Sequence, residues 1–410
     1  MRRSLTLAGK IFRQPNLGGL LAATFALGMA YSFVVPFMSI WGMQKIGMSA
    51  GTFRIFMTVT SLSAIMLSTT LARWSDTHIS RRTMLILGSC GGVIGYGGYA
   101  FLEDPVALTI VGSTAIALAS VSFSQLFAHV RETFGHSQDT DLSLGFLMSV
   151  VRVCFSFAWT VGPAIGASLM AGFGPRGVFL GAASLWLLFM VGILRHVPHS
   201  PPAGHPHAAT HLPVWRVITR GDIFISFAAL TLVFGALATN MMNLPLAVVT
   251  MLGGKESDLG IIFAVGPIVE IPLMLWFGHL AARGHQLRLI RLGVLATVGY
   301  FFLLSLATQP WHTYPAQVLS GISVAIITNI TIGFFQDMLP GQRGLATTIF
   351  SNAHNLGNLL GYFFFGTLFE AYGHRGVFLA CSFSSAAALI LLLLYRHRAV
   401  PSAAPATTTA

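Results

Sequence analysis

The feature that most constrains this chain is a long succession of apolar stretches, each about as long as a bilayer is thick, separated by short polar gaps. Charged residues make up 9% of its 410 residues, whereas soluble chains carry about 25%. Hydrophobic residues reach 54% and the mean hydropathy is +0.75. A soluble domain has no interior large enough for so much apolar surface. The composition therefore excludes a soluble globular protein and favours one that spans a membrane.

The same composition bears on several classes of function. The net charge of +11 would suit a nucleic-acid partner, but the Lys and Arg residues lie in short loops and form no basic stripe, so we predict none. No phosphate-binding loop of the G-x-x-x-x-G-K-[ST] type occurs, which argues against an ATPase. Paired acids, a metal triad or a nucleophile with a base at one depth are also missing from the sequence. We therefore predict that the protein is not an enzyme and holds no cofactor or metal.

The apolar stretches predict twelve transmembrane helices. Only helices and closed barrels satisfy every backbone polar group in hydrocarbon, and stretches of this length favour an all-α bundle. The expected ranges are 17–40, 50–72, 83–101, 106–128, 142–170, 178–194, 223–248, 258–282, 289–308, 311–335, 344–369 and 377–395.

The distribution of basic residues predicts the orientation. With a cytoplasmic N-terminus, 17 of the 23 Lys and Arg residues fall on the cytoplasmic side. The opposite side holds Lys45, Arg176, Lys255 and Arg375. This bias satisfies the positive-inside rule with both termini in the cytoplasm and favours an even number of helices. We expect a multi-pass protein of the inner (plasma) membrane that works as a monomer.

An internal repeat indicates how the helices are grouped. Residues 173–180 (FGPRGVFL) recur as residues 372–379 (YGHRGVFL), which maps the sixth helix onto the twelfth. We therefore expect a six-helix bundle at 1–194, a His- and Pro-rich cytoplasmic linker at 195–222, a second six-helix bundle at 223–395 and a disordered cytoplasmic tail at 396–410. Two pseudo-symmetric bundles in the same orientation resemble the plan of the major facilitator superfamily, which binds its substrate between the halves.

The loop after the second helix is a candidate cytoplasmic gate. It reads Ala72-Arg73-Trp74-Ser75-Asp76-Thr77-His78-Ile79-Ser80-Arg81-Arg82 and resembles the signature loop of that superfamily. An acid beside a helix N-terminus and opposite arginines can lock neighbouring helix ends together. Asp76, Arg81 and Arg82 are the residues expected to do so. A solvated charged loop is the alternative.

Two charges at membrane depth are the strongest candidates for transport. A charge at a helix centre costs about 2.5–3.5 kcal/mol on insertion scales. Glu270 could carry a proton, accept sugar hydroxyls or pair statically with an arginine. Arg152 shares a helix face with Trp159, which suits a substrate pathway, although packing between helices would also explain it. Arg54 lies about one turn inside the second helix and is expected to snorkel to the outer surface.

Amide side chains complete the expected pathway. Amides donate and accept hydrogen bonds and an indole stacks on a sugar ring, so together they suit an uncharged polyol. Hydrogen bonding between helices is the competing explanation. The amides are Gln125, Asn240, Asn243, Asn352 and Asn355.

Ordered fragments along most of the chain resemble the sugar efflux transporter family within the superfamily. They are Trp74-Ser75-Asp76, Arg81-Arg82, Gln125-Leu126-Phe127-Ala128, Arg131-Glu132, Arg152, Ala158-Trp159, Gly162-Pro163, Glu270-Ile271-Pro272, Phe335-Gln336-Asp337, Pro340-Gly341, Ala346-Thr347-Thr348 and Asn352. The resemblance implies export of sugars or glycosides across the bacterial inner membrane against proton entry. Asn243 stands where the family has an aspartate, which leaves Glu270 as the main proton-carrier candidate.

The function expected from the sequence is secondary active transport by alternating access, with a sugar or sugar-like solute moved outwards in exchange for protons. Glu270 is the expected proton-linked carboxylate, Arg152 and Trp159 the contacts in the first half, and Asn352 and Asn355 those in the second. A proton-driven exporter of amphipathic drugs is the alternative, because 11% aromatic residues would suit an adaptable pocket.

Overall fold

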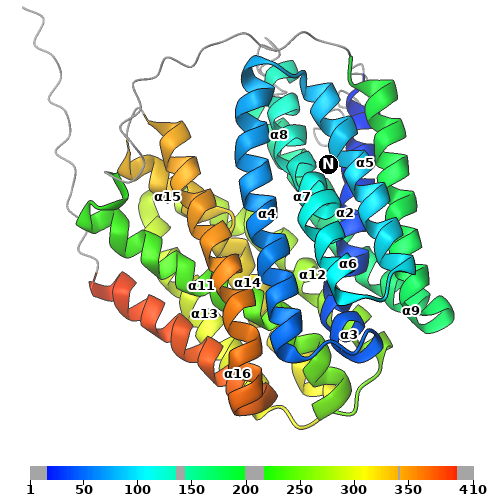
Figure 1. Cartoon of the computed structure of the whole chain (residues 1–410). Helices are drawn as coiled ribbons and strands as arrows, with labels where there is room; N and C mark the ends of the chain where they lie inside the picture. Colours follow the sequence, from blue (N-terminus) through cyan, green and yellow to red (C-terminus); the bar gives the residue numbers. More distant parts are fainter. Residues whose placement is uncertain (1–15, 135–143, 199–216, 340–341, 395–410) are drawn as a thin grey trace, which may run out of the picture.

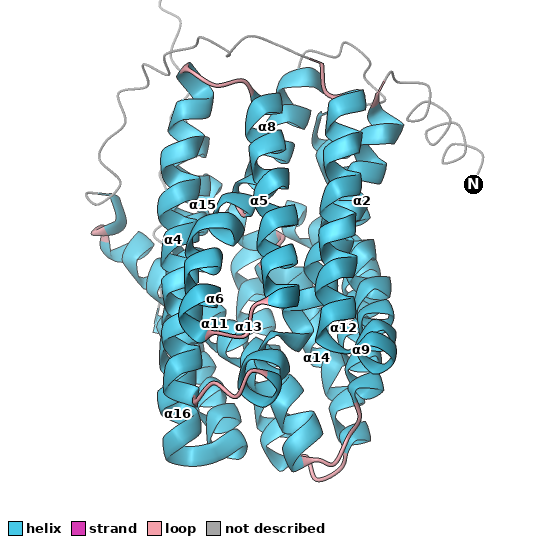
Figure 2. Cartoon of the chain, turned by 45° about the vertical axis from the view of Figure 1, so that its right-hand side comes forward, coloured by secondary structure: helices cyan, strands magenta, loops and turns pink. Residues whose placement is uncertain are grey.

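The computed structural model describes residues 16–134, 144–198, 217–339 and 342–394. Helices are the only regular secondary structure in these ranges (Figure 2). The physical reason is the solvent: each backbone polar group left unpaired in hydrocarbon costs several kcal/mol, and a helix pairs nearly all of them within one segment. The all-helical fold expected from the sequence is confirmed.

The helices follow one another in two series that are separated by residues 199–216 (Figure 1). The first series is α2 (Leu17–Val34), η1 (Val35–Phe37), α3 (Met38–Ile40), η2 (Trp41–Lys45), α4 (Ala50–Thr77), α5 (Arg81–Phe101), α6 (Pro105–Val111), η3 (Gly112–Ile116), α7 (Ala117–Ala119), α8 (Val121–Phe134) and α9 (Leu144–His196). The second series is α11 (Gly221–Leu246), η5 (Ala247–Met251), α12 (Glu256–Leu280), η6 (Ala281–His285), α13 (Gln286–Leu306), η7 (Pro310–His312), α14 (Thr313–Ile327), α15 (Ile330–Met338) and α16 (Arg343–Leu394). We refer to the two series as the first and the second half.

Ten helical stretches in the described residues are long and apolar enough to cross a bilayer. Two of them, in α9 and α16, run over 47 and 50 residues, whereas one crossing needs about 20. Each contains one glycine with a left-handed backbone, Gly174 (φ 64°) and Gly373 (φ 62°), at which the helix is interrupted. Each of these two stretches is long enough for two crossings, and the breaks at Gly174 and Gly373 agree with the twelve helices that the sequence predicts.

The two halves repeat each other in local detail. The first helix of each half ends in a π-helical segment, η2 or η5, followed by a left-handed glycine, Gly47 (φ 78°) or Gly253 (φ 70°). A glycine adopts this conformation without the steric cost that a Cβ would add. The matching kinks in α9 and α16 continue the pattern. These features agree with the pseudo-symmetric arrangement expected from the sequence repeat.

In each half, an arginine from another helix donates hydrogen bonds to a carbonyl near the C-terminal end of the last helix. Arg82, at the start of α5, donates a hydrogen bond to the carbonyl of Leu194 (2.9 Å) near the end of α9. Arg291, in α13, donates two to the carbonyl of Leu392 (2.8 and 3.0 Å) near the end of α16. The last carbonyls of a helix lack intrahelical donors, so a cation there satisfies them and interacts well with the helix dipole.

These contacts define two ends of the bundle. The end that holds residues 78–80, the start of α13 and the C-terminal ends of α9 and α16 is called the linker side. The opposite end, with Gly47, Gly174, Gly253 and Gly373, is called the far side.

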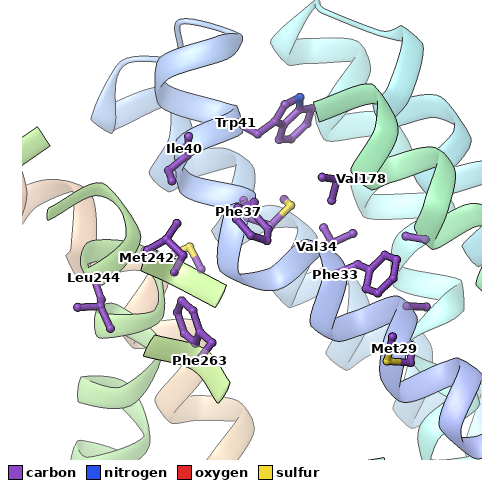
Figure 3. Close-up of a cluster of buried hydrophobic side chains, with 14 of the residues drawn as sticks. Met29, Phe33, Val34, Phe37, Ile40, Trp41, Val178, Met242, Leu244 and Phe263 are labelled. Carbon is purple, nitrogen blue, oxygen red and sulfur yellow. The ribbon is translucent and has the colours of Figure 1, made fainter. Parts of the chain in front are cut away.

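Buried apolar side chains join the halves on the far side. One core cluster contains Phe37 and Ile40 from the first half together with Met242, Leu244 and Phe263 from the second, and Figure 3 shows these side chains in one close-up. A second cluster consists only of residues of the second half and lies towards the linker side. The halves are therefore packed into one core on the far side, whereas the second half keeps a core of its own on the linker side.

Helix boundaries differ from the expected ones where polar residues interrupt a span. The range 311–335 is divided into α14 and α15 at Thr328 and Asn329. The Thr328 hydroxyl donates to the carbonyl of Val324 (2.8 Å), and the Asn329 amide donates to the carbonyl of Met274 in α12 (3.3 Å). Such side chains compete with the backbone for its hydrogen bonds. Most of the expected linker and all of the expected tail lie outside the described residues.

Candidate functional site

Glu270 lies in the interior of α12, more than three turns from its first residue Glu256, and is half-buried. Within the described residues its carboxylate makes no hydrogen bond and no ion pair. Burial of an unpaired carboxylate is costly, and in membrane helices such a group usually lines an ion or substrate path.

Arg152 reaches from α9, in the first half, to the second half. Its Nη2 donates a hydrogen bond to the carbonyl of Thr328 (3.3 Å) at the junction of α14 and α15. The charges of Arg152 and Glu270 interact electrostatically across the boundary between the halves, yet they form no direct ion pair. The two charged residues singled out in the sequence therefore face the same region.

The junction of α14 and α15 supplies two further residues that sequence reasoning missed. Thr328 offers the backbone carbonyl that Arg152 uses, and Asn329 ties this junction to α12, one turn beyond Glu270. The signal in the sequence was a pair of adjacent polar residues inside an apolar stretch. Each residue type is common in membrane helices, so the pair alone did not predict a break.

Asn352 and Asn355 lie on the face of α16 that is directed at the first half. Residues eleven apart in an α-helix point in almost the same direction, because 3.6 residues complete a turn. Asn352 thus shares its direction with Phe363 and Asn355 with Gly366, and both of these contact α4. Asn352 is exposed and Asn355 half-buried, so both amides border the space between the halves on the linker side of that contact.

Trp159 lies two turns beyond Arg152 on α9 and is half-buried. The seven-residue spacing places both side chains on one face of the helix. Arg152 and Trp159 remain the candidate cation and indole contacts of the first half.

Two predicted pathway residues are engaged elsewhere. Asn240 is buried inside the second half and donates to the hydroxyl of Tyr300 (3.1 Å), which also accepts from Gln317 (3.2 Å). Asn243 is fully buried on the far side, where it donates to the backbone carbonyl of His374 (3.1 Å) and pairs with the His374 ring (2.8 Å). Both amides connect helices within the second half, which is the competing role considered for them.

Gln125, expected in the pathway, is bonded to Arg81 of the candidate gate on the linker side. Arg81, at the start of α5, donates to Gln125 (2.9 Å) and forms an ion pair with Glu132 (2.8 Å), both in α8. The backbone of Asp76 is in α4, but its side chain lies outside the described residues. Arg81 therefore connects α5 to α8 and buries Gln125 beneath this ion pair, while Arg82 closes the end of α9.

The second half contains a contact that corresponds to the one between Arg81 and Glu132, but without an ion pair. Gln286, at the start of α13, donates to the carboxylate of Asp337 in α15 (2.8 Å). Both pairs are separated by 51 residues. The repeat thus retains the geometry and the acid, whereas the arginine is replaced by a neutral amide.

Together these residues make up a candidate site with one acid, one cation, an indole and two amides. An isolated carboxylate can bind and release a proton, and the amides and indole can hold a hydroxylated solute. The described residues include no group of three or more His, Cys, Asp or Glu side chains that could hold a metal ion.

The chain resembles several known proteins in sequence over most of its length. The chain is 31% identical to the protein of Deinococcus radiodurans named "Putative sugar efflux transporter", over 94% of this chain and 99% of that protein. It is 28% identical to sugar efflux transporter A of Dickeya chrysanthemi, over 92% of this chain and 96% of that one. Sugar efflux transporter C of Escherichia coli is 25% identical over 96% of this chain and 99% of that protein.

Solved structures share the fold. A variant of the nucleoside transporter NupG aligns with a TM-score of 0.79 at 15% identity and covers 92% of this chain and 98% of that one. A transporter of the POT family in complex with a thioalcohol-conjugated peptide aligns with a TM-score of 0.73 at 12% identity, over 92% of this chain and 94% of that one. The profile of the major facilitator superfamily matches residues 20–340 and 294–409. With its helical bundle and its site between two similar halves, the chain belongs to the major facilitator superfamily of membrane transporters.

Proposed function

We propose that the protein exports sugars or sugar-like solutes across the inner membrane by alternating access, in exchange for protons. The observation that carries the proposal is the position of Glu270. It is a carboxylate inside a membrane helix, without a hydrogen-bond or ion-pair partner among the described residues, and its charge interacts with that of Arg152 of the other half. The names of the relatives support the substrate class.

The charge arrangement supports proton coupling. When Glu270 is ionised, Arg152 compensates its charge, and when Glu270 is protonated the attraction disappears. The Arg152 side chain also donates a hydrogen bond to the carbonyl of Thr328 in the other half. Proton binding at Glu270 therefore changes the contacts that connect the two halves, and this is the property that an antiporter needs.

The uncharged polar groups support a polyol substrate. Asn352 and Asn355 face the space between the halves on one side, and Trp159 shares the face of Arg152 on the other. Amides match hydroxyl groups in hydrogen bonding, and a sugar ring presents an apolar face to an indole. Arg152 could add a charge-assisted hydrogen bond to a sugar oxygen.

Alternating access is supported by the asymmetric packing. One core runs through the first half and takes in the far side of the second, whereas the other core lies wholly within the second half towards the linker side. This is the packing of a state closed on the far side. With the positive-inside orientation, the linker side is cytoplasmic and the site awaits its substrate from the cytoplasm.

Transport in proteoliposomes tests the proposal. The protein is reconstituted, a panel of labelled sugars and glycosides is offered on the linker side, and the internal pH is followed with a trapped dye. We expect a substrate of the panel to move uphill under a pH gradient and to move protons in the opposite direction. Glu270→Gln should abolish the uphill component while it retains exchange of substrate down its own gradient.

Glu256→Gln is the matched control, because it makes the same chemical change at the far-side end of the same helix. It should transport like the unmodified protein. Full uphill transport by Glu270→Gln would reject the proton role of this carboxylate. If fluorescent amphipathic cations moved and no sugar did, the drug-exporter alternative would replace the sugar-exporter proposal.

A further inference from the structure

The far-side closure contains a charged contact that neither the sequence nor the comparisons assign. Arg54, one turn inside α4, was expected to snorkel to the surface. In the structure its side chain instead crosses to α16 of the second half. Its Nη1 donates a hydrogen bond to the hydroxyl of Thr367, and its guanidinium lies 5.4 Å from the centre of the Phe363 ring.

The surrounding packing holds the guanidinium in this place. Gly366 lies between Phe363 and Thr367 in sequence and lets the two helices approach closely. A Cβ built at Gly366 would come within 2.7 Å of the Ala50 carbonyl and 2.9 Å of the Arg54 Cβ. Next to them the Phe53 ring of α4 meets the Phe365 ring of α16, and both are buried.

The duplicated halves meet on the far side along two related helix contacts, which we call seams: α4 with α16, and α12 with α9. Only the first seam contains an arginine at this position. α9 and α12 meet on the far side in the arrangement that corresponds to α16 and α4. There Gly260 occupies the position of Arg54, and Ala164 that of Phe363. The Cβ position of Gly260 is 3.0 Å from the Cα of Ala164. One seam is thus a contact of small residues, and the other is bridged by an arginine.

We propose that Arg54 is a latch that holds the far side closed and sets the ratio of the far-side-closed and far-side-open states. The proposal rests on the alternating access proposed above. A charge-assisted hydrogen bond and a cation–π contact both form between the halves and both are lost when the seam opens. A side chain whose contacts differ between two states shifts their equilibrium by that difference.

Distance measurements between spin labels test the latch in the full-length protein. Labels are placed at Gln44→Cys and Gln309→Cys, two exposed far-side positions in different halves, in a background that lacks the three native cysteines. Electron–electron double resonance then reports the separation of the halves in bilayers, without substrate or a pH gradient. The populations of short and long distances give the ratio of the two states.

Arg54→Ala should raise the ratio of long to short distances about tenfold, the order expected when a charged hydrogen bond and a cation–π contact are lost together. Thr367→Val and Phe363→Leu should each produce a smaller increase, and neither should add its full effect to that of Arg54→Ala. Ile55→Ala is the matched control, because Ile55 is the next residue on α4 and is 56% exposed. It should leave the ratio unchanged.

Gly366→Val separates failure of the latch from failure of alternating access, because its side chain clashes with the α4 backbone at Ala50 and forces the helices apart while the guanidinium of Arg54 is retained. If Gly366→Val increased the long distances and Arg54→Ala, with Thr367→Val, did not, the latch would be refuted and alternating access would stand. If Ile55→Ala shifted the ratio as much as Arg54→Ala, the effect would not belong to the arginine. If even Gly366→Val left the distances unchanged, both proposals would fail.

Discussion

At the scale of single residues, the energetic cost of a charge in the membrane interior depends on the groups that surround it. Arg152 and Glu270 approach each other from different halves without a direct ion pair, and Arg152 donates to the carbonyl of Thr328 instead. Such an arrangement compensates both charges and leaves the carboxylate free to bind a proton. Breaking a buried pair costs about 3–5 kcal/mol because one charge stays uncompensated.

This dependence predicts a rescue between two variants. Arg152→Gln should lower the thermal stability of the purified protein, because Glu270 then keeps its charge without the compensating cation. The double variant Arg152→Gln with Glu270→Gln should regain about 1–3 kcal/mol of that loss. Unfolding in detergent micelles, followed by tryptophan fluorescence, measures both. Arg375→Gln, at an exposed far-side arginine, should have little effect, and a double variant no more stable than the single one would contradict the coupling.

A second residue prediction concerns Tyr300, whose hydroxyl accepts hydrogen bonds from Asn240 and Gln317 inside the second half. Tyr300→Phe leaves two buried donors without their acceptor, and each unsatisfied group costs about 1–3 kcal/mol. The midpoint of thermal unfolding should therefore fall by several degrees. Tyr314→Phe removes the bond of a less buried hydroxyl to Asp258 and should cost much less. Equal losses in the two variants would show that burial is not the cause.

At the scale of helical elements, hydrogen bonds at the helix ends help to determine which helices pack against each other. Arg82 and Arg291 each close the last helix of one half from the third, although the residues around them differ. A helix C-terminus leaves carbonyl groups unpaired, and a cation on a neighbouring helix satisfies them while it fixes the contact between the two helices.

Arg291→Met tests this closure, because methionine keeps an unbranched apolar stem and removes the guanidinium. The carbonyl of Leu392 loses two hydrogen bonds, so the free energy of unfolding should fall by about 1–3 kcal/mol. Arg288→Met, at an exposed position in the same helix, should fall within about 0.5 kcal/mol of the unmodified protein. Chemical denaturation in mixed micelles provides both values, and similar losses at the two positions would contradict the assignment.

Helix breaks mark the limit of what these elements reveal in a sequence. Apolar stretches predicted the helices themselves, because lipid allows little else. The division at Thr328 and Asn329 was missed, since Thr328 bonds within its own helix and the Asn329 amide gains its partner only once α12 lies beside it. The interruptions at Gly174 and Gly373 fall between the two helices expected in each place.

At the scale of the whole molecule, the distribution of cores is asymmetric. One core runs through the first half and takes in the far side of the second half, whereas the other lies wholly within the second half towards the linker side. Two rigid bundles joined at one end can exchange this contact for one at the other end by rocking.

Thiol labelling tests the open side. Asn352→Cys, between the halves, should react with a membrane-impermeant maleimide applied from the linker side. Ser39→Cys is a conservative change at a residue of α3 that is fully buried in the far-side core, and it should be protected in the same state. Both are made in a background without native cysteines and followed by mass shift. Protection of Asn352→Cys with labelling of Ser39→Cys would mean that the molecule is open on the opposite side.

The candidate site was predicted in part. Glu270 and Arg152 were recognised because a charge in an apolar stretch needs a reason, and the structure places both at the boundary of the halves. The amides could not be separated in this way. Asn240 and Asn243 look like Asn352 and Asn355 in sequence, yet the first two bond within the second half, whereas the last two face the first half.

The sequence by itself determined the solvent, the helical fold and the duplicated plan, because these depend on local hydrophobicity, segment length and repetition along the chain. The tertiary structure alone decided which polar side chains work together. Arg54 contacts Phe363 and donates to Thr367, which lies 313 residues away in the sequence. Arg152 donates to the carbonyl of Thr328 over a separation of 176 residues, and Asn243 bonds to His374 over 131 residues. The partner of a polar group in lipid is set by the helix that packs beside it, and that neighbour is not written in the local sequence.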